Sequence, residues 1–259
     1  MKLLNKIKDK SLSFVVPLIL LILWEIATRL ELFPIQLLVS PKQVIFSFMD
    51  LLKQGDLIVH LKISLLRVIG GFLLGILTGF ILGIAMGLSK RVEEYAGPLF
   101  NSIRQIPLLG WMPLLMLWLG VGESFKITFI AMGAFYPMAL NTFEGIKNVP
   151  REYVEVARVF EYDKLRLLQK VILPAALPSI FTGIRLSLSM SWMSVVGAEL
   201  VAASEGIGYL MTWSRQLFQF DIVMIGVIII GVVGLIMDQV MGWFEVYFLR
   251  WRKTSFNTE

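Results

Sequence analysis

The stretch NVPREYVEVARVFEYDKLRLLQKVILPAALPSIFTG, residues 148–183, decides how this chain folds. It is the one long polar interruption in a sequence that otherwise consists of apolar blocks. Six basic and four acidic residues lie between Lys147 and Leu173, and so many charges cannot be placed in hydrocarbon. We therefore predict that this segment lies in water and joins two segments that cross a membrane.

The first half of the interruption has the pattern of a short helix. Pro150 suits a first helical position, and Glu152 then falls in the first turn, where the helix dipole favours an acid. Val154, Ala157 and Phe160 recur at the spacing that gives a helix one apolar face. Because a helix of about three turns is not stable alone, this face is predicted to pack against another segment.

The second half predicts another helix, which leads back to the membrane. Asp163 is a good capping residue for its first turn, and Leu165, Leu168 and Ile172 give it an apolar side. Pro174 and Pro178 follow and remove two backbone donors, so they are expected to mark the point where the chain bends towards the membrane.

The composition is that of an integral membrane protein. Hydrophobic residues make up 57% of the chain and charged residues only 17%, which leaves room for one transmembrane domain, residues 1–259, and no soluble domain. The net charge of +5 does not indicate nucleic acid, because the basic residues lie at the ends of apolar blocks without interleaved aromatic residues. The absence of cysteine excludes thiol chemistry and cysteine metal sites.

Apolar runs of about 20 residues are long enough to cross roughly 30 Å of hydrocarbon. Fifteen basic residues fall on the side that holds the N-terminus and six on the other, so both termini and the loop 146–175 are predicted to be cytoplasmic. This indicates a multi-pass protein of the plasma or inner membrane, in contact with the lipid bilayer. The predicted spans are 12–31, 62–88, 98–120, 125–145, 176–203 and 221–248.

The second and third spans carry marked glycine and proline patterns. Glycine stands at every fourth position from Gly71 to Gly87, which predicts close packing on a helix of the same or of another subunit. Pro107 and Pro113, with Gly110 between them, predict that the third span is kinked or locally unwound. Irregular backbone at membrane depth needs protein or a water-filled cavity beside it, so this span is placed inside the bundle.

Candidates for a translocation path lie in the third and fifth spans. Ser187, Ser191 and Ser194 share one face of the fifth span, with Met190 beside them, and could supply hydroxyl donors to a small oxyanion. The alternative is that each serine bonds a carbonyl four residues back in its own helix. Trp111 in the third span either lines the path or packs.

The remaining polar residues do not form a catalytic or metal-binding pattern. Glu199 is predicted to pair with a neighbouring residue, and the lone His60 is predicted to be an exposed side chain at the membrane interface. Asp238 and Glu245 have no histidine, cysteine or second carboxylate at ligand spacing. An intramembrane enzyme would need such a cluster, so the sequence argues against this class.

The polar interruption carries a resemblance to a known family. The permease subunits of ATP-binding-cassette (ABC) importers have the signature Glu-Ala-Ala, three residues, Gly, then about a dozen residues ending in Ile-x-Leu-Pro. The matching residues here are Glu155, Val156, Ala157, Glu161 and the segment 171–174. Glu161 replaces the turn glycine, which costs roughly 1 kcal/mol if the position needs a positive φ. Either the turn has moved towards residues 162 and 163, or the helix runs on.

Two further segments, residues 102–127 and 197–210, resemble the sulfonate, taurine and nitrate branch of that family. The resemblance implies an all-α membrane protein of the MetI-like, type I importer fold that performs no catalysis. It also implies a second permease copy, an ABC ATPase dimer that binds ATP and Mg²⁺, and an extracytoplasmic substrate-binding protein. The residues implied to couple to the ATPase are Glu152, Glu155, Val156, Ala157, Arg158, Phe160, Glu161, Leu173 and Pro174.

The resemblance implies a small anionic solute, namely an aliphatic sulfonate, taurine or nitrate. Bicarbonate and pyrimidine or riboflavin-like solutes are the alternatives within the family. A secondary transporter driven by an ion gradient is a further alternative, although internal repeats and a larger number of spans are typical of that class and are not found here.

Overall fold

A computed structural model describes residues 2–32, 34 and 38–250 of the chain, with side chains from residue 15 onward. The described residues form helices and loops and include no β-strand. The orientation predicted from the basic residues also used charges near the two ends of the chain. Six of these residues lie outside the described side chains: Lys2, Lys6, Lys8, Lys10, Arg252 and Lys253.

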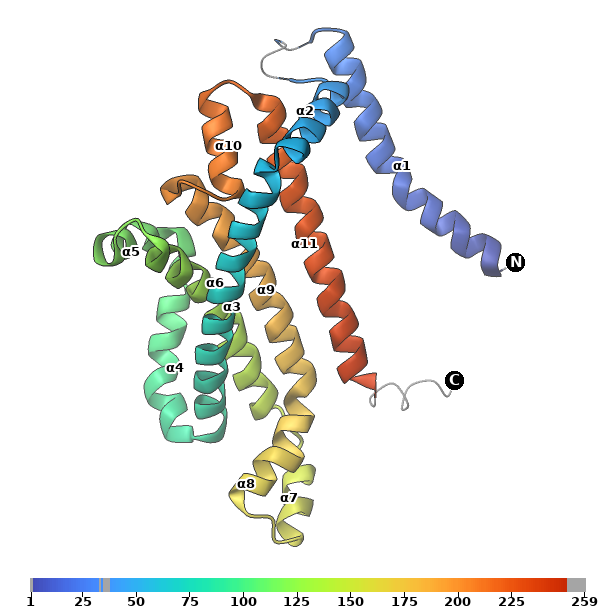
Figure 1. The fold of residues 1–259 in the computed structure, drawn as a ribbon. Coiled ribbons are helices and arrows are strands. Elements are labelled where there is room, and N and C mark those ends of the chain that lie inside the picture. Colours follow the sequence, from blue (N-terminus) through green and yellow to red (C-terminus); the bar gives the residue numbers. More distant parts are fainter. Residues whose placement is uncertain (1, 33, 35–37, 251–259) are drawn as a thin grey trace.

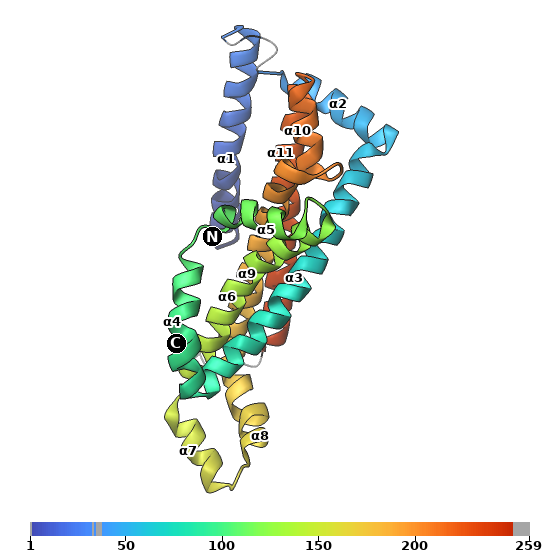
Figure 2. The ribbon, with the colours of Figure 1, turned by 90° about the vertical axis from the view of Figure 1, so that its left-hand side faces the viewer.

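The helices are, in chain order, α1 (Lys2–Arg29), α2 (Pro41–Gln54), α3 (Asp56–Leu88), α4 (Lys90–Arg104), a 3-10 helix (Leu108–Trp111), α5 (Met112–Leu119), α6 (Glu123–Lys147), α7 (Arg151–Val159), α8 (Lys164–Leu167), a π-helical turn (Leu168–Ile172), α9 (Leu173–Ala202), α10 (Ile207–Gln216) and α11 (Phe220–Phe248). The long helices run between two ends of the molecule, which we call the α7–α8 end and the α2–α10 end after the short helices found there (Figures 1 and 2).

Helix α6 lies at the centre of the molecule, between α3 and α9. Its residues Phe125, Phe129 and Ile130 are fully buried. Helix α1, in contrast, stands apart from the bundle in Figure 1 and meets it through α2. The indole Nε1 of Trp24 donates a 2.9 Å hydrogen bond to the carbonyl oxygen of Val39, just before α2.

The glycines that recur along α3 form its contact with α6. A Cβ atom at Gly79 would lie 2.6 Å from the carbonyl oxygen of Phe135, and one at Gly83 would lie 2.6 Å from the Cβ of Thr142. Since real Cβ atoms do not come so close, only glycine permits this approach of the two helices. The predicted packing role is therefore confirmed, and the neighbour is a helix of the same chain.

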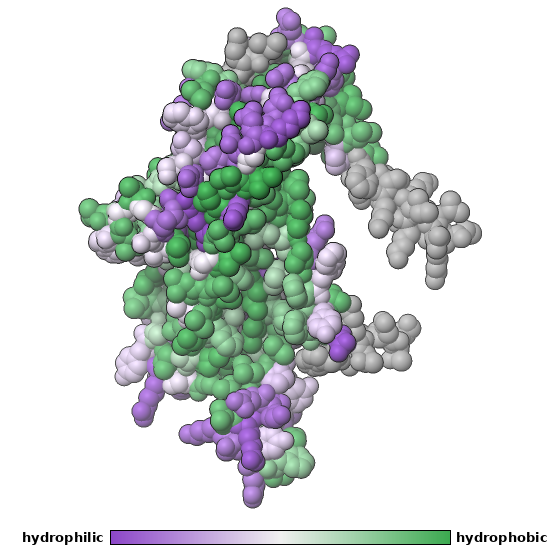
Figure 3. All heavy atoms as spheres, in the orientation of Figure 1, coloured by the Kyte–Doolittle hydropathy of each residue, from purple (hydrophilic) through white to green (hydrophobic). Residues whose placement is uncertain are grey.

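Three helical segments are long and apolar enough to cross a membrane within the described part of the chain: α3, residues 164–202 and α11. Figure 3 shows apolar side chains gathered along the middle of the molecule, with polar side chains concentrated at its two ends. Helices α1 and α6, with 28 and 25 residues, occupy the places of the first and fourth predicted spans.

The third predicted span, residues 98–120, is not one helix. It is divided among α4, the 3-10 helix and α5, and the chain is not helical at Gln105–Pro107. The kink predicted from Pro107 and Pro113 is thus present. Helix α4 begins at Lys90, before residue 98 where the predicted span starts, and Ser89 caps it by accepting a 3.4 Å hydrogen bond from the amide of Val92.

Candidate functional site

The residues predicted to couple the chain to a partner, except Leu173 and Pro174, lie in a two-helix projection, residues 150–172, at the α7–α8 end (Figure 1). Pro150 precedes the first helical residue of α7 instead of occupying it, and its backbone has ψ of 132°. Glu152 lies in the first turn, as predicted. The projection consists of the short helix α7, a turn, and the short helix α8, which continues through the π-helical turn into α9.

The turn after α7 is closed at the position of Glu161. Its backbone is left-handed, with φ of 56°. Its amide donates to the carbonyl oxygen of Arg158 (2.9 Å), and the amide of Tyr162 donates to that of Ala157 (3.1 Å). This is the hydrogen-bond pattern of a Schellman motif, in which glycine is the usual residue. Both alternatives drawn from the sequence are wrong, because the turn has not moved and the helix does not run on.

Helix α8 begins at an aspartate cap. The carboxylate of Asp163 accepts a 2.9 Å hydrogen bond from the amide of Arg166, as the sequence predicted. The chain then remains helical to Ala202 without interruption, through the π-helical turn and past Pro174 and Pro178. A π turn just before Pro174 is a recognised way to accommodate a proline in a continuing helix.

The projection exposes both apolar and charged side chains. Ala157 is buried, at 4% exposure, and Val154 is half-buried. Phe160 was predicted on the same packed face but is 71% exposed, because α7 ends at Val159 and Phe160 belongs to the turn. The side chains predicted for coupling that point into solvent are those of Glu152, Glu155, Val156, Arg158, Phe160 and Glu161, and Tyr153, Val159 and Leu165 are exposed beside them.

The base of the projection is packed firmly into the bundle. Leu173 joins a cluster around the buried residues Ile146 and Ala176, at the end of α6 and the start of α9. A Cβ at Gly145 would lie 2.8 Å from the Cβ of Ser179. Pro174 is half-buried beside this cluster. The two helices that carry the projection are thus in close contact where it begins.

The three serines proposed for a path lie in the interface between α6 and α9. Ser187 and Ser191 are fully buried, and Ser194 is 5% exposed. The hydroxyl of Ser187 donates to the carbonyl oxygen of Ala134 on α6 (2.6 Å), and that of Ser194 donates to Met190 in its own helix (2.6 Å). In the chain as described, these hydroxyl groups face packed protein and not open space.

A cavity of about 490 Å³ lies beside that interface. Met190 lines it, whereas Trp111 packs against the cluster that contains Met112 and Phe129. The walls come from the break after α4, from α6 and from α9. The lining residues are Arg104, Gln105, Ile106, Pro107, Leu108, Gly133, Tyr136, Pro137, Leu140, Asn141, Leu186 and Met190.

Nearer the α2–α10 end, a buried charge network joins α3, α6 and α9. The guanidinium of Arg67 donates to Glu199 (2.8 Å) and forms a bidentate pair with Glu123 (2.6 and 2.8 Å). Lys126 donates to Glu123 (2.7 Å), and the hydroxyl of Ser64 donates to Glu199 (2.8 Å). The prediction that Glu199 is paired is confirmed. Its main partner was missed, although a basic residue inside a predicted span is itself a signal of pairing or function.

The same network holds the loop before α10. Glu199 accepts a 3.0 Å hydrogen bond from the amide of Gly208, and Arg67 donates to the carbonyl oxygen of Glu205 (2.6 Å). His60 accepts a 3.0 Å hydrogen bond from the amide of Gly206 through Nδ1. The prediction of an exposed His60 is wrong, since the ring is half-buried and fixes this loop.

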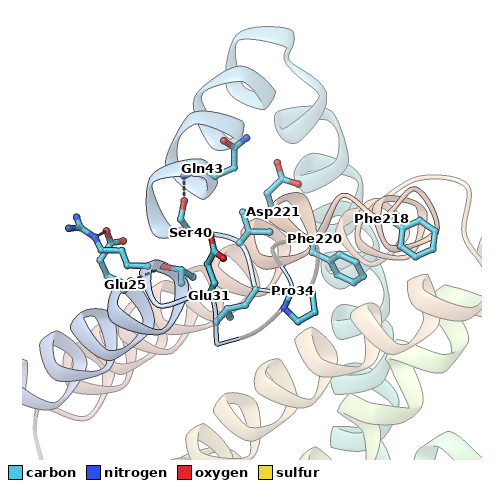
Figure 4. A pocket seen from close by; sticks show the side chains of 12 residues that line it. Glu25, Glu31, Pro34, Ser40, Gln43, Phe218, Phe220 and Asp221 are labelled. Carbon is cyan, nitrogen blue, oxygen red and sulfur yellow. Dashed lines mark hydrogen bonds and ion pairs between the residues drawn. The ribbon is translucent and has the colours of Figure 1, made fainter.

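A larger cavity of about 750 Å³ opens at the α2–α10 end, between α1, α2 and the start of α11 (Figure 4). Glu25, Glu31 and Asp221 give it acidic walls, and Phe218 and Phe220 lie at its edge. No group of three or more histidine, cysteine or acidic residues that could hold a metal ion occurs within the described residues.

A second ion pair links the halves of α9 and α11 that lie nearer the α7–α8 end. Arg185 donates two hydrogen bonds of 2.6 Å to Asp238, and Glu245 lies 3.6 Å from the same guanidinium. The two acids that the sequence left without a role therefore balance one basic residue, and this arrangement is structural.

Comparison with known proteins agrees with this architecture. Residues 71–246 match the family described as binding-protein-dependent transport system inner membrane component. SsuC of Bacillus subtilis, named for a proposed role as an aliphatic sulfonates transport permease, is 41% identical over 242 residues, which are 93% of this chain and 88% of that protein. The taurine transport system permease protein TauC of Escherichia coli is 31% identical, over 89% of this chain and 86% of its own length.

A solved structure shows that the fold is shared as well. One chain of an amino acid ABC transporter crystallised with histidines superimposes with a TM-score of 0.63 at 19% identity, over 78% of this chain and 95% of that chain. The predicted all-helical, type I importer fold is thereby confirmed. The chain belongs to the binding-protein-dependent transport system inner membrane components, the non-catalytic permease subunits of ABC importers, whose ATP is hydrolysed by a separate subunit.

Proposed function

We propose that this permease carries a small oxyanion, in the first place an aliphatic sulfonate or taurine, and that the projection 150–172 transmits the movement of its ATPase. Two copies of the chain form the path. An ABC ATPase dimer, which binds ATP and Mg²⁺, docks at the α7–α8 end, and a substrate-binding protein docks at the α2–α10 end. The orientation, with both termini and the loop 146–175 in the cytoplasm, follows from the basic residues.

The observation that carries this proposal is the combination of exposure and rigid attachment in the projection. Val159 and Phe160 are 80% and 71% exposed at its tip, with Glu155, Arg158 and Glu161 around them. Such a mixture of exposed aromatic, aliphatic and charged side chains is typical of a surface that another protein covers.

The attachment supports a rigid-body role for the projection. The helix from Lys164 to Ala202 is continuous, and Leu173 packs in the cluster that also holds the end of α6. Helices α6 and α9 are in close contact at Gly145 and Ser179. A displacement of α7 would therefore move α6 and α9 together. Pro174 stands where this displacement enters α9.

The path is proposed to follow the exposed side of α9 and not the serine face. Leu186, Met190 and Met193 are each between 46% and 69% exposed, and Leu186 and Met190 line the 490 Å³ cavity. A second copy would cover this side and close the cavity. Trp111 and the three serines then serve the packing that holds the wall in place.

The substrate class rests on the names of the relatives. The sulfonate and taurine permeases are similar over most of this chain. Bicarbonate, nitrate and pyrimidine or riboflavin-like solutes remain the alternatives, and a binding protein would decide among them by its own ligand.

Proteoliposomes that contain this chain, its ATPase and its binding protein test the proposal. We expect uptake of ethanesulfonate that requires internal ATP and is abolished by vanadate, whereas uptake driven by an ion gradient would survive vanadate. Deletion of residues 152–160, or Glu155→Lys, should remove the ATPase from the purified complex. Full retention of the ATPase by both variants would contradict the proposed role of the projection.

A further inference from the structure

Arg104 differs from Arg67, Lys126 and Arg185, three other basic residues inside predicted spans. Arg67 and Arg185 are each held by two carboxylates, and Lys126 is held by Glu123. Arg104 lies in the predicted span 98–120 and has no carboxylate within 4 Å among the residues that the structure describes. A charge at membrane depth without a partner is costly, and it is found where a site requires it.

The position of Arg104 along α4 places it well inside the membrane. Helix α4 starts at Lys90, beside the ion pair that joins Glu93 to Lys147, and it points away from the α7–α8 end (Figures 1 and 2). Helix α4 has 15 residues, and the chain rises by about 21 Å from Lys90 to Arg104, compared with roughly 30 Å for the whole hydrocarbon layer. The guanidinium is thus on a level with hydrocarbon and not with the lipid headgroups.

Arg104 also lines the 490 Å³ cavity. Gln105 on the same wall and Tyr136 and Asn141 on the α6 wall add polar groups, and none of the lining residues is acidic. The cavity therefore combines one uncompensated positive charge with neutral polar groups. An arginine fork can donate to both oxygens of a carboxylate or to two of the three oxygens of a sulfonate, which makes this combination suited to a small oxyanion.

The irregular backbone after α4 is consistent with such a site. Residues 105–107 are not helical, and Pro107 leads into the 3-10 helix. Non-helical backbone at membrane depth is tolerated where it lines a water-filled cavity. The charge and the break in the helix thus occur side by side on one wall of the same cavity.

We propose that Arg104 is the anion-binding residue of the translocation path, and that the cavity around it is a transient site for the oxyanion between the binding protein and the cytoplasm. The site rests on the proposed function. Arg104 would select negatively charged solutes within the permease, and this selection is distinct from the specificity of the binding protein.

The test compares three variants in proteoliposomes with ATPase and binding protein, using ethanesulfonate as the probe. Arg104→Gln should lower the rate of uptake at saturating loaded binding protein by about tenfold, as expected for one lost charge-assisted hydrogen bond. Gln105→Glu leaves Arg104 in place but adds a carboxylate to the cavity, and should lower uptake similarly. Arg91→Gln, an exposed residue of the same helix, is the control and should not change uptake.

Assembly with the ATPase is measured for each variant. If Arg104→Gln does not assemble, the uptake rate of Gln105→Glu tests the site. Uptake at the wild-type rate by either assembled cavity variant would overturn the site while leaving the proposed function intact. If the wild-type complex takes up no ethanesulfonate and instead carries a neutral solute, the proposed substrate class is overturned, and the site with it.

Discussion

The amide of Tyr162 donates a 3.1 Å hydrogen bond to the carbonyl oxygen of Ala157, and this bond closes α7 within the projection. This bond requires Glu161, the residue before Tyr162 in the turn, to adopt a left-handed backbone. The turn therefore keeps the geometry that glycine provides in the family signature without having the glycine. As a result, an exposed carboxylate stands at the tip of the proposed docking surface.

The first prediction concerns this strained position. Glu161→Gly should stabilise the chain by up to about 1 kcal/mol, because glycine adopts a positive φ without steric cost. Thermal unfolding in detergent measures the change. Glu155→Gly is the control, since the same substitution inside α7 should destabilise by roughly 1 kcal/mol. A loss of stability in both variants would show that the left-handed turn is wrongly assigned.

The second prediction concerns the contact between α3 and α6. Gly79→Ala should destabilise by about 1–3 kcal/mol, because the added Cβ meets the backbone carbonyl of Phe135 at 2.6 Å. Gly70→Ala on the same helix has no atom within 4 Å of the added Cβ and should be neutral or slightly stabilising. Equal effects of the two substitutions on the melting temperature would refute the described packing.

The third prediction concerns the buried charge network. Arg67→Gln should destabilise by about 3–5 kcal/mol, because it leaves the fully buried carboxylate of Glu199 without its cation. Arg29→Gln breaks an exposed pair with Glu25 and should cost at most about 1 kcal/mol. The melting temperatures of the two variants in detergent give the comparison. If both melt alike, Arg67 and Glu199 are not paired in a dry environment.

The fourth prediction separates packing from a path at the serines of α9. The hydroxyl of Ser191 is buried and makes no hydrogen bond in the structure. Ser191→Ala should therefore leave stability unchanged or raise it, and should leave substrate uptake unchanged. Ser187→Ala removes the bond to Ala134 and should cost about 1 kcal/mol. A marked loss of uptake with Ser191→Ala would contradict the packing role and would indicate that this face of α9 lines the translocation path.

Much of the fold could be predicted because each signal was local. The kink of the third span followed from Pro107 and Pro113, and the cap of α8 from Asp163. Both signals depend on backbone chemistry within a few residues. The glycine repeat of α3 predicted a close contact for the same reason, since the absence of side chains is visible in the sequence itself.

The parts that could not be predicted depend on contacts between distant segments. Arg67 and Glu199 are 132 residues apart, and nothing local shows which acid meets which base. Likewise, a stripe of serines has the same pattern whether it faces a pore or another helix, and only the position of α6 decides. Phe160 was misplaced because helix boundaries shift by one or two residues, which moves a terminal residue from a buried face to the turn.

The proposed role of the projection depends above all on a partner ATPase that covers it. The chain contains no cysteine, so a single introduced cysteine gives an unambiguous cross-linking site. Val159→Cys lies at the tip of the projection, and Phe218→Cys, which replaces a similarly exposed residue at the α2–α10 end, is the matched control. In membranes that contain the whole complex, a thiol-reactive photo-cross-linker should join the ATPase to residue 159 and not to residue 218. Cross-linking of the ATPase from residue 218, or its absence from residue 159 in an assembled complex, would contradict the account.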